Sequence, residues 1–145
     1  MTRRLSISLG VTGLAVIGSL LASSADSAQV APGGKDFKPA TTVHLLMEGQ
    51  GMVFVQIRDA LSNAETPHRY QIIEAGAGVL AELANVNTLN SEKEDYRGWA
   101  GELRDTAMAL AQEADKKAAA DEGKLSELFN QMKSKCAACH DVYQD

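Results

Sequence analysis

The chain has 145 residues and a net charge of −5, with 45% hydrophobic and 23% charged residues. This length is typical of one domain, and an acidic chain is a poor nucleic-acid binder because phosphate contacts need a basic surface. Aromatic residues make up only 5% and three prolines occur. Together with the abundance of alanine and leucine in the second half, this favours helices.

Residues 1–25 have the three-part form of a secretory signal. Arg3 and Arg4 precede an apolar run, and small residues follow it. We expect cleavage after Ala25, with Ala28 as the alternative, and a periplasmic mature chain. A retained membrane anchor is the competing interpretation, but the run is at the short limit for a span and contains serine and glycine.

Residues 26–38 are polar, contain Pro32-Gly33-Gly34 and are expected to form a flexible leader. Residues 39–145 are expected to form the single domain. No later apolar run is long enough to cross a bilayer, so we expect a mature protein that does not span the membrane.

Four segments of this domain repeat apolar residues at three- and four-residue steps, which predicts four amphipathic helices. The first is expected from about Pro39 to Asn63, the second from Thr66 to an end between Asn85 and Asn90, the third from Ser91 through Ala114, and the fourth from near Asp121 to Tyr143. Short connections force antiparallel neighbours, so the fold is predicted to be all-α, an up-down-up-down four-helix bundle.

Local signals mark the helix starts. Thr41 or Thr42 is expected to cap the first helix. Thr66 followed by proline fits an N-cap with proline at the first helical position. Ser91 with Glu94 three residues later fits a capping box.

Gly49 and Gly51 lie inside the first helical segment, where each costs about 1 kcal/mol relative to alanine. Two interpretations are open. The glycines mark a local kink, or their missing side chains leave room for a flat cofactor.

The strongest motif is Cys136-Ala-Ala-Cys139-His140, which contains both cysteines of the chain. Two cysteines at this spacing followed directly by histidine form the pattern of c-type haem attachment. On a helix Cys136 and Cys139 lie one turn apart on one face, so both sulfurs can reach the vinyl groups of one porphyrin. His140 lies on the same side and is predicted to bind the iron.

Other uses of a Cys-x-x-Cys pair fit less well. A redox-active pair usually begins a helix in a β-α-β unit, whereas this pair comes late in a helical segment. A structural zinc site needs four ligands, and the chain has two cysteines and only distant histidines besides His140. A disulfide across so small a loop stabilises little.

A helical bundle whose last helix ends in Cys-x-x-Cys-His-x-x-Tyr resembles the class II cytochromes c, the group of cytochrome c′ and cytochrome c556. Residues 136–143 match the attachment segment of this family. The sequence Tyr96-Arg-Gly-Trp99 resembles the start of its third helix, and Leu46-Met47 resembles the region that faces the open side of the iron. The resemblance spans residues 39–145 and implies one covalent haem c.

The sequence departs from the family at two positions. Val43 stands where the family often has an arginine that meets a haem propionate, and Gln144 stands where a basic residue usually follows the tyrosine. No residue is therefore predicted to bind the propionates.

The resemblance implies Met47 as the second axial ligand, and a thioether ligand raises the reduction potential of haem iron. The open alternatives are core packing by Met47, ligation by His44 or Met52, and a five-coordinate iron. Trp99 is predicted to be a core anchor, with contact to the haem edge as a second role. Met108 and Met132 are predicted to lie in the core.

These observations predict a carrier of single electrons rather than an enzyme. Lys133 and Lys135 either attract a negatively charged redox partner or form a solvated helix face. An open iron instead predicts a binder of nitric oxide or carbon monoxide, and a peroxidase-like activity with His44 as acid–base group is a third option. The resemblance also allows a homodimer through the first two helices.

Overall fold

The computed structural model of this chain describes residues 38–143. The expected signal at residues 1–25 and all but the last residue of the leader at 26–38 lie outside the described residues. The described part contains four α-helices and a short 3-10 turn, and it has no strand. Their bounds are α1 Val43–Ser62, α2 Arg69–Asn87, α3 Glu94–Asp115, η1 Lys117–Ala119 and α4 Glu122–Tyr143.

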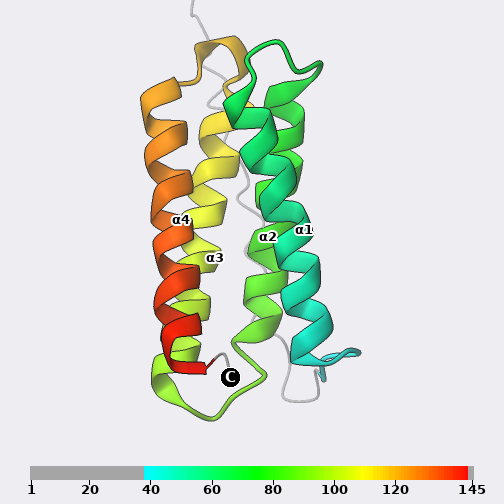
Figure 1. The fold of residues 1–145 in the computed structure, drawn as a ribbon, viewed down its shortest axis with the longest axis vertical. Coiled ribbons are helices and arrows are strands. Elements are labelled where there is room, and N and C mark those ends of the chain that lie inside the picture. Colours follow the sequence, from blue (N-terminus) through cyan, green and yellow to red (C-terminus); the bar gives the residue numbers. More distant parts are fainter. Residues whose placement is uncertain (1–37, 144–145) are drawn as a thin grey trace, which may run out of the picture. The chain divides into compact units, whose positions relative to one another are not determined.

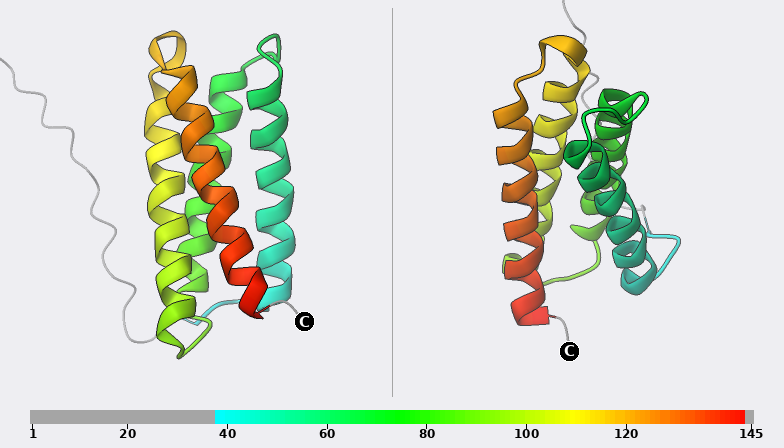
Figure 2. Two further views of the ribbon diagram at one scale, coloured as in Figure 1. Left: turned by 60° about the vertical axis from the view of Figure 1, so that its left-hand side comes forward. Right: turned by 45° about the horizontal axis from the view of Figure 1, so that its top comes forward.

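The four α-helices lie side by side, and the chain reverses direction between each of them and the next (Figure 1). Each helix packs against its neighbours in sequence, whereas α1 and α4 contact each other very little. Figure 2 shows α4 crossing the bundle obliquely. The prediction of an all-α bundle is confirmed for residues 38–143. None of the described helices is long and apolar enough to cross a membrane.

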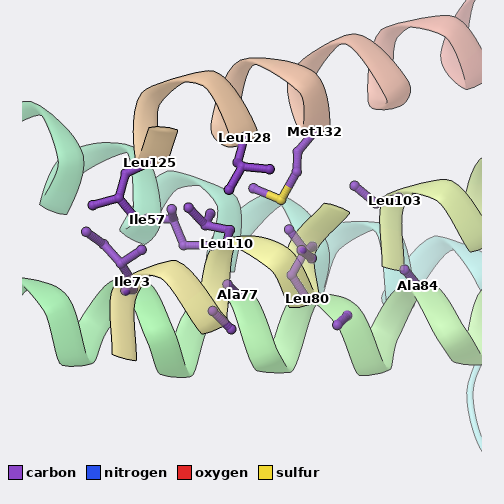
Figure 3. Close-up of a cluster of buried hydrophobic side chains, with 14 of the residues drawn as sticks. Ile57, Ile73, Ala77, Leu80, Ala84, Leu103, Leu110, Leu125, Leu128 and Met132 are labelled. Atoms are coloured by element: carbon purple, nitrogen blue, oxygen red, sulfur yellow. The ribbon is translucent and has the colours of Figure 1, made fainter. Parts of the chain in front are cut away.

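The core is formed by the apolar stripes that the sequence predicts on the four helices. Ile57 of α1, Ile73 of α2, Leu110 of α3 and Leu125 of α4 are each 0% exposed, and they converge in one cluster (Figure 3). Burying one such side chain stabilises the fold by about 1.5–3 kcal/mol relative to leaving it exposed. The core therefore fixes the separation of the helices.

The two methionines predicted to lie in the core have different environments. Met132 is fully buried, as predicted, whereas Met108 is 42% exposed and its prediction is wrong. The inner face of α3 at this level is occupied by Ala107, Leu110 and Ala111, so Met108 points outward.

Two helix starts are capped by side chains. The backbone N–H of Leu45 donates to Thr42 Oγ1 at 3.3 Å, which confirms the predicted cap of α1. The backbone N–H of Lys124 donates to Asp121 Oδ1 at 3.0 Å at the start of α4. Each contact satisfies a backbone donor that the helix itself leaves free.

The predicted starts of α2 and α3 are wrong by a few residues. His68 has a left-handed φ of 58°, which an α-helix cannot continue, so Thr66 and Pro67 form a turn and α2 begins at Arg69. Ser91 Oγ accepts a hydrogen bond from the backbone of Lys93 at 3.1 Å. It closes a local turn instead of capping α3.

One end of the bundle is held by a polar cluster. Arg69 donates two hydrogen bonds to Glu122, with Nη1 to Oε1 at 2.8 Å and Nη2 to Oε2 at 2.9 Å. Its Nε also donates to the carbonyl of Ala60 at 3.2 Å, and Tyr70 Oη donates to Glu122 at 2.7 Å. These contacts join the end of α1 to the starts of α2 and α4.

Glu113 holds the connection between α3 and α4. Although only 2% exposed, it accepts hydrogen bonds from the backbone of Asp121 at 2.9 Å and from Lys116 Nζ at 2.7 Å. These two bonds lower the pKa of Glu113 to about 2. The buried carboxylate thus stays charged and fixes the loop that turns the chain into α4.

The lowered pKa of Glu113 predicts a pH-dependent contribution to stability. Because the folded pKa lies below the ordinary value of 4.5, the contribution is complete above pH 4.5 and is lost as the pH falls toward 2. Glu113→Gln should lower the melting temperature at pH 7, and its difference from the unaltered chain should shrink over that acidic range. Exposed Glu127, changed to Gln, is the control. A Glu113→Gln deficit that persists undiminished at pH 2 would contradict the assignment.

A close approach of α1 and α2 depends on Gly76. A Cβ at this position would lie 2.9 Å from Ile57 Cγ1, whereas a Cβ at Gly78 would meet nothing within 4 Å. Gly76→Ala should therefore destabilise the fold by about 1–3 kcal/mol through overpacking. Gly78→Ala on the same helix should stabilise it by up to about 1 kcal/mol. Urea unfolding of both variants tests this, and equal midpoints would show that the two helices separate freely.

Candidate functional site

A largely apolar cavity of about 220 Å³ lies between the four helices. All four contribute residues to it: Met47, Gln50, Gly51 and Phe54 from α1; Leu80, Ala84 and Asn87 from α2; Tyr96, Trp99, Ala100 and Leu103 from α3; Lys133, Lys135, Cys136, Cys139 and His140 from α4. Ala84 and Leu103 lie at the end of the core cluster away from Ile73 and Leu125 (Figure 3). The cavity therefore continues the core toward the end of α4.

The sparse contact between α1 and α4 explains where the cavity forms. Phe54 of α1 and Phe129 of α4 stack with ring centroids 4.4 Å apart. Phe54 also lines the cavity. Toward the end of α4, residues of both helices line the cavity.

The two cysteines reach the cavity because they continue the buried stripe of α4. Leu125, Leu128 and Met132 face the core at three- and four-residue steps, and Cys136 and Cys139 follow at the same spacing. Both cysteines are half-buried free thiols that line the cavity. His140 lines it as well and is more exposed. The structure thus brings the three residues of the motif to one site.

Met47 lines the same cavity from α1 and is half-buried. The other ligand alternatives do not reach it. The side chain of His44 is 80% exposed, with Nε2 3.4 Å from Glu48, and Met52 is 68% exposed. Among the proposed ligands from α1, only Met47 borders the cavity.

The two glycines of α1 have different surroundings. The helix continues without a break across both. A Cβ at Gly49 would lie 3.6 Å from Leu83 of α2, whereas a Cβ at Gly51 would have nothing within 4 Å, and Gly51 lines the cavity. A Cβ at Gly49 would make ordinary van der Waals contact, so the packing of α1 on α2 does not require glycine there, whereas Gly51 has open space beside it at the cavity.

An aromatic cluster fixes the last turn of α4 against the first turns of α3. Tyr143 contacts Tyr96 and Trp99 edge-on, with ring centroids 5.4 and 5.9 Å apart. Its hydroxyl donates to Asp95 Oδ1 at 2.8 Å. Burial and this bond raise the pKa of Tyr143 to about 12. Because Trp99 lines the cavity and is half-buried, it serves as a wall of the site rather than as a fully buried core anchor.

Two buried polar groups of the cavity were missed by sequence reasoning. Gln50 and Tyr96 are each 7% exposed, and neither Gln50 Nε2 nor Tyr96 Oη has a hydrogen-bond partner among the described residues. The sequence signal that could have identified Gln50 is its position as a glutamine inside an otherwise apolar helical stripe. Both groups lack the partner that buried polar atoms normally have.

The thiol pKa values and the neighbouring side chains bear on two other uses of the Cys-x-x-Cys motif, a redox-active pair and a metal site. Burial raises the pKa of Cys136 and of Cys139, with further contributions from Cys139 and Asp95 respectively. A redox-active Cys-x-x-Cys pair needs a thiol of lowered pKa, so this arrangement disfavours one. No cluster of three or more potential metal-binding His, Cys, Asp or Glu side chains occurs within residues 38–143.

Comparisons of the chain with protein-family models, with characterised proteins and with solved structures found no match. A function for the cavity therefore has to follow from its residues and their arrangement.

The raised thiol pKa values predict slow alkylation. At pH 7 both cysteines of the folded, haem-free chain should react with iodoacetamide more slowly than in the urea-unfolded chain, because the thiolate is the reactive form. The rate should increase as the pH is raised above 9. Faster reaction of the folded chain at pH 7 would instead indicate an activated thiolate and an oxidoreductase site.

Proposed function

We propose that this chain is an exported c-type cytochrome that carries single electrons on one covalently bound haem. One observation carries the proposal. A single apolar cavity is lined by Cys136, Cys139 and His140 from α4 and by Met47 from α1. These are the residue types that attach haem c and close both axial positions of its iron.

Each residue has a specific role in this proposal. Cys136 and Cys139 hold the haem through thioether bonds, His140 is the proximal ligand and Met47 is the distal ligand. Bound haem supplies the exchange between ferric and ferrous iron on which electron transfer depends. The thioether of Met47 favours the ferrous state and raises the potential. With both axial positions closed by side chains, no substrate site remains, so the protein is not an enzyme.

The size of the cavity supports a haem whose porphyrin ring is partly exposed to solvent. Its volume of about 220 Å³ is smaller than the roughly 300–1,000 Å³ of pockets that enclose a whole ligand. Helices α1 and α4, which both line the cavity, contact each other little, so a flat group can separate them without breaking the core. The apolar walls keep water from the faces of the ring, and an exposed edge provides the route for electrons to a partner.

The positive charges at the cavity support a protein partner. Lys133 and Lys135 border the cavity, and Lys135 is paired with Glu102 of α3. Lys133 thus supplies the freer positive charge for docking an acidic redox protein.

The space beside Gly51 favours a second candidate function. If Met47 does not bind the iron, a small ligand such as nitric oxide or carbon monoxide has room on this side of the cavity, since a Cβ at Gly51 would meet nothing within 4 Å. The chain would then be a gas-binding cytochrome of the c′ type. The two functions share the attachment site and differ only in the distal ligand.

Replacement of Met47 separates these functions. In the chain produced with haem-attachment machinery, we expect a low-spin spectrum that carbon monoxide leaves unchanged. Met47→Ala should convert it to a high-spin spectrum that shifts on adding carbon monoxide, because the iron loses its distal ligand. Absorption spectra of the reduced protein measure both properties.

Two variants on the same helix are matched controls. Met52→Ala removes an exposed thioether and His44→Ala removes an exposed imidazole, so neither should alter the spectrum. A high-spin, carbon monoxide-sensitive spectrum of the unaltered chain would support the gas-binding function instead. If the spectrum changes with His44→Ala and not with Met47→Ala, the assignment of the distal ligand is wrong.

A further inference from the structure

Two buried polar groups of the cavity have no hydrogen-bond partner among residues 38–143, and they point to a further contact with the ligand. Gln50 Nε2 and Tyr96 Oη are the atoms concerned. Both residues are 7% exposed and both line the cavity. A buried donor without a partner destabilises the fold, so these groups need an explanation beyond packing.

The two groups reach the cavity from different helices. Gln50 lies on α1, three residues after Met47, so both side chains face the same side of the helix. Tyr96 lies in the first turn of α3, where its ring packs edge-on against Tyr143. Because α1 packs mainly on α2 and α3 packs on α2 and α4, the two groups approach the cavity from opposite walls.

The neighbouring residues show that neither group is required by the fold. The hydroxyl of Tyr143 donates to Asp95 at 2.8 Å, whereas the hydroxyl of Tyr96, whose ring packs against Tyr143, has no partner within residues 38–143. Gln50 occupies the stripe between Leu46 and Phe54, and its Nε2 makes no hydrogen bond to any described residue. A leucine and a phenylalanine would therefore serve the described structure better.

The charges that line the cavity indicate which acceptor these donors meet. The chain has a net charge of −5, yet no aspartate or glutamate is among the described residues that line the cavity. Its charged side chains are Lys133 and Lys135. Donors and cations around an apolar space suit a flat ligand that carries anionic groups.

We propose that Gln50 and Tyr96 donate hydrogen bonds to carboxylate oxygens of the ligand, and that they select a porphyrin with carboxylates over an uncharged one. This inference rests on the proposed function, since haem carries two such carboxylates. It assigns the carboxylate contacts to residues of α1 and α3 that the sequence pattern does not mark.

The test uses metal-free porphyrins and the haem-free full chain, so that neither thioether formation nor iron ligation contributes. Mesoporphyrin IX has two carboxylates and no vinyl groups, and etioporphyrin has only alkyl substituents. Quenching of Trp99, the one tryptophan of the chain, reports binding because Trp99 lines the cavity. Gln50→Leu and Tyr96→Phe should each weaken mesoporphyrin binding about tenfold and leave etioporphyrin binding unchanged.

Thermal unfolding of the same haem-free variants supplies a second readout. Gln50→Leu and Tyr96→Phe should leave the melting temperature unchanged or raise it, because each removes an unpartnered buried donor. Tyr70→Phe is the matched control for the hydroxyl. It breaks the bond to Glu122 at the other end of the bundle, so it should lower the melting temperature and leave porphyrin binding unchanged. Gln56→Leu, an exposed glutamine of α1, is the control for the amide and should change neither.

Each outcome of the titrations has a definite meaning. Selective loss of mesoporphyrin binding supports the inference. Equal losses for both porphyrins would show that the side chains only pack, and affinities unaffected by the substitutions would show that the carboxylates bind elsewhere. Either of these results overturns the inference and leaves the proposed function intact. If neither porphyrin quenches Trp99 in the unaltered chain, the inference fails, whereas a haem held by thioether bonds and iron ligation is tested separately by the spectra of the loaded protein.

Discussion

The sparse contact between α1 and α4 is the constraint on which the site depends. Three of the four faces of the bundle are closed by direct packing of successive helices, and the Phe54–Phe129 stack is the main aromatic contact across the fourth. Because interiors are normally packed as densely as organic crystals, a cavity lined with apolar side chains in so small a bundle is a costly feature. Under the proposed function, a haem at this position supplies the contacts that α1 and α4 do not make with each other.

Helical periodicity was sufficient to predict most of the fold and the part of the site on α4. The repeat that buries Leu125 and Met132 continues to Cys136 and Cys139, so the position of the motif on the inner face followed from spacing alone. The same reasoning placed Met47 on the inner face of α1. That these two faces border one cavity depends on the separation of α1 and α4, which results from tertiary packing and has no local signal.

The errors of sequence reasoning have local physical causes. Thr66-Pro67 and Ser91 carry the residue types of helix caps, but the left-handed backbone of His68 and a turn closed by Ser91 Oγ delay the two helices. Met108 is an apolar residue of a type that often lies in a core, but it is on the outer face of α3. Gln50 and Tyr96 resemble ordinary stripe residues, and their lack of partners is visible only when the neighbouring side chains are placed. The helix starts therefore depend on backbone conformation, and the unpartnered polar groups depend on hydrogen bonding in the folded chain. Neither property can be predicted from helical periodicity.

The central claim is that the cavity holds a haem bound covalently by the two cysteines. Intact-mass measurement of the denatured chain, produced in cells with haem-attachment machinery, tests this claim most directly. We predict a mass increase equal to one haem, and its complete loss when Cys136 and Cys139 are both changed to serine. A denatured chain with the mass of the polypeptide alone, from cells in which another c-type cytochrome is loaded normally, would contradict the account.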